Sequence, residues 1–395
     1  MSIKRKIFSS SLERLKGESA YDALAKAKAL EAEGKEIIHL EIGEPDFDTP
    51  KNIIDKGVWA MNNGYTHYTA APGLMEVRKV IAEHVSATRN VPVLPEEVII
   101  GPGAKPVIFD FISACVGEGD EVLIPNPAYP PYESLVNYMG GVSVPVPLIE
   151  EKGLRFEVEN LEKLITSKTK ILVINSPQNP TGGVLTQGDL EYIREIVLKH
   201  DLLVLSDEIY SENIYEGKHH SIYSLDGMKE RTVLVDGASK TFAMTGWRIG
   251  YAVGPKEIIE KMSLILLNTV SCTATFTQIA LVEALTNSSD SVKKMVKEFN
   301  VRRDVLVDGL NAIEGVKCQK PHGAFYVFPN FKSFGMTSKE LFDYLLIEAG
   351  VCCSWGSAFG KYGEGYLRFS YANSVENIKK ALKNMEKALK KLKKN

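Results

Sequence analysis

The sequence predicts an α/β protein with a mostly parallel central sheet flanked by helices, and a second, smaller α+β domain built from both termini. Two observations support this class. Short apolar runs alternate with longer amphipathic segments, which is typical of a parallel sheet covered by helices. Polar or glycine-rich motifs then follow five of the apolar runs directly. We expect residues 1–45 to contribute to the smaller domain, 46–290 to form the large domain and 291–395 to complete the smaller one.

The five expected strands share one arrangement, an apolar run followed by a motif. They are 98–100 before 101–105, 121–124 before 125–129, 171–174 before 175–180, 202–205 before 206–210, and 232–235 before 236–248. In open α/β sheets, ligands bind outside the carboxyl ends of the strands. The sequence therefore predicts one ligand site to which all five motifs contribute.

Composition excludes several classes of protein. The chain has 395 residues, 44% of them hydrophobic, and a net charge of −3, so charge suggests neither a nucleic-acid nor a membrane partner. Its five cysteines are dispersed and lack a Cys-x-x-Cys pair, which argues against disulfides and a zinc site; we expect no metal. The basic start at 1–6 is not followed by an apolar stretch. These features favour a cytoplasmic protein.

Lys240 carries the chemistry expected at this site. It follows a predicted buried strand, lies between Ser239 and Thr241, and is followed by Arg248. An amine in that setting suits a phosphate-bearing aldehyde held as a Schiff base. The alternative, for a lysine considered alone, is a solvated surface side chain.

Three motifs together resemble the class I/II aminotransferases, which are fold type I pyridoxal-phosphate enzymes. They are Asn-Pro-Thr-Gly at 179–182, Asp-Glu-x-Tyr at 207–210, and Ser-Lys at 239–240 with Arg248, and the resemblance covers about 43–372. The opening pattern at 43–50 is similar to that of the prokaryotic aspartate aminotransferase subgroup. The resemblance implies pyridoxal 5′-phosphate as cofactor.

The resemblance implies three catalytic residues, Lys240, Asp207 and Tyr210. Lys240 would form the Schiff base with the cofactor and then move a proton at the substrate α-carbon, and Asp207 would pair with the pyridine nitrogen. Tyr210 and Asn179 would hydrogen-bond the phenolate oxygen of the cofactor. Considered alone, Asp207 could instead be a helix N-cap and Asn179 a turn residue.

The resemblance also implies how the cofactor phosphate and ring are held. The phosphate donors would be Gly103, Ala104, Lys105, Ser239 and Arg248, with Tyr68 reaching the phosphate of a neighbouring subunit, so a homodimer is expected. Tyr129 would stack on the cofactor ring, unless it is simply a core tyrosine.

Substrate residues follow from the same resemblance. Arg368 would hold the α-carboxylate of the substrate, Gly43 would leave room beside it, and Asn179 would also contact the substrate. Lys105 would meet the distal carboxylate, which favours aspartate or glutamate as amino donor and a 2-oxo acid such as 2-oxoglutarate as acceptor. Lys105 could equally cap backbone or only add charge near the phosphate.

Other functions stay open at this point. Trp355 and Tyr129 could wall an apolar pocket for alanine or aromatic donors, since 354–360 departs from the common family pattern. A carbon–sulfur lyase would share the same scaffold. A binding module that holds the cofactor without turnover is the third possibility.

Overall fold

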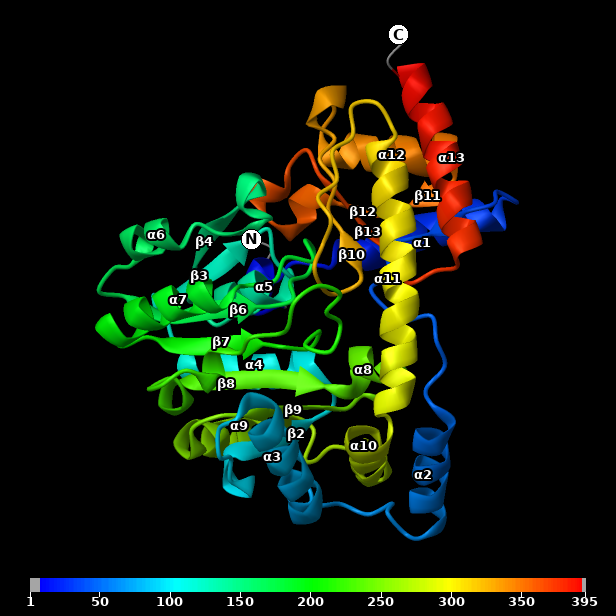
Figure 1. Cartoon of the computed structure of the whole chain (residues 1–395). Helices are drawn as coiled ribbons and strands as arrows, with labels where there is room; N and C mark the ends of the chain where they lie inside the picture. Colours follow the sequence, from blue (N-terminus) through cyan, green and yellow to red (C-terminus); the bar gives the residue numbers. More distant parts are fainter. Residues whose placement is uncertain (1–7, 393–395) are drawn as a thin grey trace, which may run out of the picture.

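The structure is a computed structural model that describes residues 8–392. The basic start at 1–6 therefore lies outside the described residues, and so do the outer limits of both terminal segments. An eight-stranded sheet dominates the molecule, in the order β2-β9-β8-β7-β6-β3-β4-β5 (Figure 1). Its strands are β2 (Val98–Gly101), β3 (Glu121–Asn126), β4 (Val142–Ile149), β5 (Arg155–Phe156), β6 (Thr169–Asn175), β7 (Leu203–Asp207), β8 (Thr232–Gly237) and β9 (Gly250–Val253).

The strand directions bring the expected motifs to one edge of the sheet. Neighbours β4, β3, β6, β7 and β8 are parallel, and β9 is antiparallel to both β8 and β2, so β2 runs in the same direction as β8. All five expected strands therefore end at the same edge. The predicted α/β class with a mostly parallel sheet is confirmed.

Alternating side chains of the sheet bury its two faces under different helices. Val122, Val173 and Val235 share a buried cluster with α4 (Ala104–Cys115), α5 (Pro131–Tyr138) and α9 (Lys256–Thr269). On the opposite face, the intervening residues Leu123, Leu172 and Val204 pack with α6 (Val158–Leu161) and α7 (Gln187–Lys199). Because both faces are covered, these strands read as continuous apolar runs in the sequence.

Helices α2 (Lys51–Asn62), α3 (Met75–Arg89) and α10 (Thr275–Asn287) cover the end of the sheet near β2 and β9. Ile100 and Leu234 from the sheet join them in a cluster that continues into the smaller set of strands. This cluster links the sheet to the rest of the molecule.

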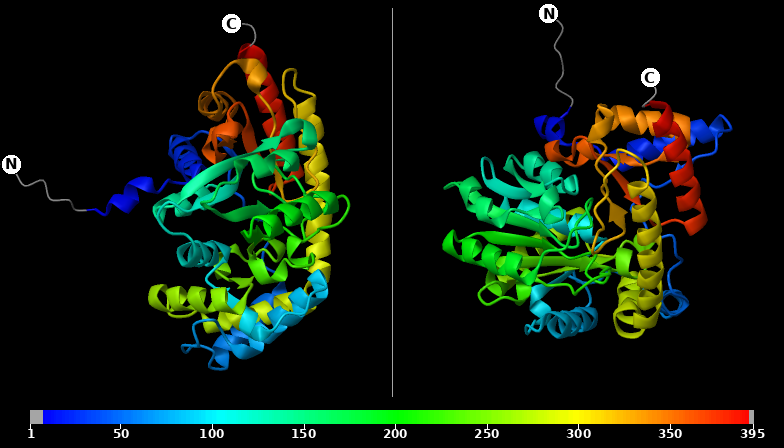
Figure 2. Two further views of the ribbon diagram at one scale, coloured as in Figure 1. Left: turned by 90° about the vertical axis from the view of Figure 1, so that its left-hand side faces the viewer. Right: turned by 45° about the horizontal axis from the view of Figure 1, so that its top comes forward.

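The smaller set of strands combines the two terminal parts of the chain. β1 (Ile38–His39) pairs in parallel with β11 (Val351–Cys352), and β13 (Leu367–Ser370) lies between β10 (Tyr326–Val327) and β12 (Ser354–Trp355). Helices α1 (Ser19–Ala32), α12 (Ser338–Ala349) and α13 (Val375–Leu392) surround them. The long helix α11 (Ser289–Asn311) runs along one side of the molecule, from the region of α10 to these strands (Figures 1 and 2).

Residues 8–392 contain neither a candidate membrane-spanning helix nor a candidate metal-binding cluster. No helix in this part of the chain combines the length and apolar character needed to cross a membrane. Over the same residues, no group of three or more His, Cys, Asp or Glu side chains is arranged to hold a metal ion.

Candidate active site

A cavity of about 500 Å³ lies at the edge of the sheet where the five strands end. Most of the residues expected at the site line it: Gly43, Ala104, Lys105, Tyr129, Asn179, Asp207, Tyr210, Ser239, Lys240, Arg248 and Arg368. Segments far apart in the sequence thus converge on one space, as the motif arrangement predicted. Gly103 does not line the cavity itself but lies against Arg248, which does. Tyr68 does not line the cavity and is exposed to solvent.

Lys240 lies on the short helix α8 (Ala238–Thr241), directly after β8. Its ammonium group donates a hydrogen bond of 2.6 Å to the backbone carbonyl of Gly43. Burial, together with the nearby cations Arg368 and Arg248, lowers the pKa of Lys240 to about 8, against the opposing effect of Glu44. A much larger fraction of this amine is therefore neutral near pH 8 than of an ordinary lysine.

Asp207 ends β7 and is 4% exposed. The Tyr132 hydroxyl donates a hydrogen bond of 2.5 Å to Oδ2, and the Ile209 amide donates one of 3.1 Å to Oδ1. Burial raises the pKa of Asp207 to about 6, although the Tyr132 hydrogen bond opposes the rise. A turn rather than a helix follows Asp207, so the alternative of a helix N-cap is wrong.

Tyr210 and Tyr326 form a pair of buried hydroxyls 2.8 Å apart. Burial raises the pKa of both phenols, so both are neutral donors at neutral pH. Gly43 packs against this pair, because a Cβ atom at Gly43 would lie only 1.9 Å from the Tyr326 hydroxyl. Any side chain at position 43 would therefore displace the Tyr326 ring.

Arg368 lies on β13 and is 4% exposed. One guanidinium nitrogen, Nη1, donates a hydrogen bond of 3.0 Å to Oδ1 of Asn179, and Nη2 donates to the backbone carbonyl of Glu41. The buried Nε of Arg368 has no hydrogen-bond partner. A buried arginine with only neutral partners and an unused donor suits an anionic ligand.

Gly103 and Arg248 form a second cationic corner. The Arg248 guanidinium donates to the backbone carbonyls of Thr245, at 2.7 Å, and Pro102, at 3.3 Å. Gly103 has φ +107°, and a Cβ there would lie 2.5 Å from Nη2 of Arg248. Ser239 and the first turn of α4, which starts at Ala104, complete a cradle of donors suited to a phosphate group.

Lys105 and Tyr129 form another wall of the cavity. The Lys105 ammonium lies 5.6 Å from the centroid of the Tyr129 ring and forms an ion pair with Glu18. Trp355 does not line this cavity. It packs against Phe342 and borders a neighbouring cavity, so the idea that Trp355 walls the donor pocket finds no support in this structure.

Several residues that line the cavity were not predicted from the sequence, namely Tyr132, Tyr326, Glu18 and Tyr21. The signal for Tyr132 was its place three residues after Tyr129, next to the same proline-rich strand end. For Glu18 no sequence signal was visible, because it precedes an ordinary helix far from the five motifs.

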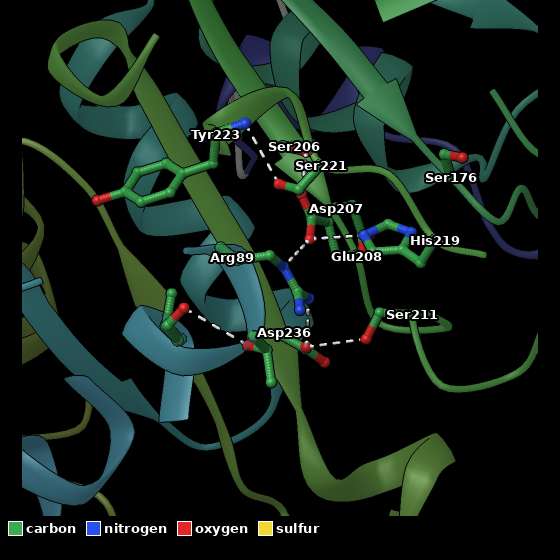
Figure 3. Close-up of polar contacts among 12 residues, drawn as sticks. Arg89, Ser176, Ser206, Asp207, Glu208, Ser211, His219, Ser221, Tyr223 and Asp236 are labelled. Carbon is green, nitrogen blue, oxygen red and sulfur yellow. Dashed lines mark hydrogen bonds and ion pairs between the residues drawn. The ribbon is translucent and has the colours of Figure 1, made fainter. Parts of the chain in front are cut away.

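A buried charge network lies behind Asp207 (Figure 3). Glu208, which is 1% exposed, accepts hydrogen bonds from Arg89 at 2.8 Å and Ser206 at 2.9 Å, and contacts His219 at 2.9 Å. Arg89 also lies 3.7 Å from Asp236 on β8. Burial acts to raise the pKa of Glu208, but Arg89 and His219 outweigh it and hold the pKa at about 2.

This network fixes the strand ends that carry the site. Arg89 belongs to α3, Glu208 follows Asp207 at the end of β7, and Asp236 lies on β8 shortly before Lys240. One guanidinium thus ties two adjacent strands to a covering helix. Removing one partner of a buried ion pair leaves an uncompensated buried charge.

Comparison with known proteins identifies the family. The model of the aminotransferase class I and II family matches residues 35–385. The chain is 47% identical to an aspartate aminotransferase of Pyrococcus abyssi, over 88% of this chain and 90% of that protein, and 43% identical to aromatic-amino-acid aminotransferase 2 of Thermococcus litoralis over the same shares. It superposes with a TM-score of 0.94 on a solved Pyrococcus protein of 44% identity, covering 97% and 98% of the two chains.

It also superposes with a TM-score of 0.93 on an aspartate aminotransferase from Thermus thermophilus, solved with maleate, at 37% identity and covering 96% and 99% of the two chains. The chain belongs to the class I and II aminotransferases, which are pyridoxal-phosphate-dependent enzymes that act on amino acids and 2-oxo acids.

The residues present fit that cofactor. A phosphate suits the corner of Gly103 and Arg248, since a Cβ atom at position 103 would fill the cradle. A cationic ring nitrogen suits the buried carboxyl group of Asp207. When bound, pyridoxal phosphate supplies an aldehyde carbon and an electron-withdrawing ring. Lys240 offers a weakly basic amine that could bond to such a carbon.

We predict that Arg89→Met lowers the free energy of unfolding by about 3–5 kcal/mol, because it leaves Glu208 buried without its guanidinium partner. Chemical denaturation measures this change. The control is Lys51→Met, which breaks the exposed pair with Asp55 and should change stability by less than about 1 kcal/mol. Equal, small losses in both variants would contradict the assigned role of the network.

Lys240→Met should stabilise the apoprotein at pH 7 by up to about 3 kcal/mol relative to the wild type. The folded wild type binds the Lys240 proton more weakly than the unfolded chain does, with a pKa of about 8 against an ordinary 10.5. The penalty is therefore complete below pH 8 and disappears as the pH rises to 10.5.

Denaturation of both apoproteins between pH 7 and 10.5 measures the difference. A stability difference that stays constant over this range would show that the Lys240 pKa is not lowered.

Proposed function

We propose that this aminotransferase takes its amino group from an acidic L-amino acid, aspartate or glutamate, and passes it to a 2-oxo acid such as 2-oxoglutarate. One observation carries the proposal: besides Arg248 at the phosphate cradle, the cavity that contains Lys240 is lined by two other cations, Arg368 and Lys105, from opposite parts of the chain. Two cations at separate places suit the two carboxylates of such substrates. The relatives named for aspartate support the same choice.

The proposed roles of the other residues follow their contacts. Arg368 binds the α-carboxylate through its unused donor, with Asn179 orienting the guanidinium. Lys240, as a neutral amine, removes the proton from the substrate α-carbon and delivers it to the aldehyde carbon of the cofactor. Asp207, held by Tyr132, keeps a proton on the ring nitrogen of the cofactor.

The remaining cofactor contacts are proposed from the cradle and the hydroxyl pair. Ser239, Arg248 and the α4 amides beside Gly103 and Ala104 bind the phosphate, and Tyr129 stacks on the ring. Tyr210 and Asn179 donate to the phenolate oxygen, with Tyr326 as the hydroxyl partner of Tyr210.

We also propose a cytoplasmic homodimer. Tyr68 is 90% exposed, which is unusual for a tyrosine side chain and suits one that completes the phosphate site of a second copy. The proposed division of the chain is a large cofactor-binding domain at 46–290 and a smaller domain at 1–45 and 291–395. The start of α11 at Ser289 supports the second boundary.

An uncharged donor is the second candidate. Lys105 is already paired with Glu18, and Tyr21 and Tyr129 add aromatic surface to the same cavity. A relative named for aromatic amino acids agrees with this possibility. A lyase would differ from both aminotransferases, because it would release a 2-oxo acid and ammonia without any acceptor.

Lys105→Met tests the acidic donor. Loss of the cationic contact should lower kcat/KM for aspartate by a factor that corresponds to about 1.5–3 kcal/mol, and leave alanine and phenylalanine nearly unchanged. Steady-state rates with 2-oxoglutarate as acceptor measure the effect. Equal losses for all three donors would mean that Lys105 serves the cofactor and does not bind the distal carboxylate. Turnover of an amino acid without any acceptor would indicate an elimination reaction and support the lyase.

The dimer is tested by mixing two variants, Lys240→Ala, which should be inactive, and Tyr68→Phe, which should be impaired, after dissociation and reassociation. In a mixed dimer, one site combines Lys240 from one subunit with Tyr68 from the other. We expect activity to rise well above the sum of the two separate variants. Sedimentation as a monomer, or no gain on mixing, would contradict the proposal.

A further inference from the structure

Glu18 and Lys105 form an ion pair in the wall of the active-site cavity. The side chains are 24% and 43% exposed, so solvent reaches both charges. Lys105 follows Ala104 in the first turn of α4, and Glu18 comes from the segment that leads into α1. The pair therefore joins the amino-terminal segment to the central part of the site.

The position of Glu18 leaves its carboxylate available for this contact. Glu18 occupies the N-cap position of α1, where polar side chains commonly accept hydrogen bonds from the first amides of the helix. No side-chain capping hydrogen bond is present at this helix end. Displacing the Glu18 carboxylate from Lys105 would therefore cost no capping interaction.

The two cations proposed to bind substrate differ in their partners. Arg368 contacts neutral groups, the Asn179 amide oxygen and the Glu41 backbone carbonyl, with one donor unused. Lys105 is already neutralised by a carboxylate. An acidic substrate thus finds one free cation for its α-carboxylate and one occupied cation for its distal carboxylate.

We propose that Glu18 is a specificity-determining residue, which competes with the distal carboxylate of an acidic substrate for Lys105. This inference rests on the proposed function. An acidic substrate must displace Glu18, whereas a substrate with an uncharged side chain leaves the ion pair intact. Glu18 therefore weakens the preference of the site for dicarboxylates.

The test compares ligand binding to the wild-type holoenzyme and to Glu18→Gln. Maleate serves as the dicarboxylate probe and 3-phenylpropionate as the monocarboxylate probe with an uncharged side chain, with both dissociation constants measured by calorimetry. Because a partly exposed ion pair contributes little, we expect maleate to bind about three- to tenfold more tightly to the variant. Binding of 3-phenylpropionate should stay within about twofold.

Two controls make the result specific. In a Lys105→Met background, Glu18→Gln should no longer tighten maleate binding, because the contested cation is gone. Glu133→Gln changes a glutamate that pairs with Lys16 at 2.7 Å beside the neighbouring cavity, and it should leave both dissociation constants unchanged.

Three results would overturn the role of Glu18: maleate binding that is unchanged or weaker in Glu18→Gln, equal tightening of both ligands, or a gain that persists in the Lys105→Met background. The proposed function is judged separately, by wild-type turnover of aspartate with 2-oxoglutarate. Failure of that turnover would refute the donor assignment, while the maleate comparison would still decide the role of Glu18.

Discussion

The common direction of β2, β3, β6, β7 and β8 is the constraint on which the site depends. Because these strands end at the same edge, side chains far apart in the sequence meet there without any long loop. Asp207 and Lys240 are placed by the ends of two adjacent strands, β7 and β8. The Arg89 guanidinium holds these same ends through Glu208 and Asp236. Catalytic geometry and core stability are therefore linked at this edge.

Charge is distributed unevenly around that edge. The cavity is lined by four cations and by the acidic residues Glu18, Glu44 and Asp207, and two of the cations, Arg368 and Arg248, help burial to lower the pKa of Lys240 to about 8. Behind the cavity, Arg89 and His219 hold the pKa of the buried Glu208 at about 2, whereas burial raises the pKa of Asp236 to about 8, although Arg89 opposes the rise. Glu208 is thus a buried anion outside the cavity lining, and Arg89 links it to Asp236 on β8.

The sequence predicted the parts of this arrangement that are local. An apolar run followed by polar residues predicts both the strand that ends in Asp207 and the strand that leads directly into Lys240. Tyr326 and Arg89 could not be found this way, because their partners Tyr210 and Glu208 are distant in the chain and only the folded chain brings them together.

The ion pair of Glu18 with Lys105 was not predicted either, because the two residues are distant in the chain. Lys105 follows the glycine turn expected to bind the phosphate, and we expected it to meet the distal carboxylate of the substrate. No residue near Lys105 in the sequence indicated that Glu18, from the amino-terminal segment, would pair with it. The side-chain pocket was the least predictable part of the site, since it is assembled from the ends of elements and not from one motif.

We propose that Lys240 is the residue that bonds to the cofactor. Reduction of the pyridoxal-phosphate-loaded protein with borohydride, followed by proteolysis and mass spectrometry, locates that bond directly. We expect one pyridoxyl group per chain, on the peptide that contains Lys240. A label on Lys105 or on surface lysines, with Lys240 unmodified, would contradict it.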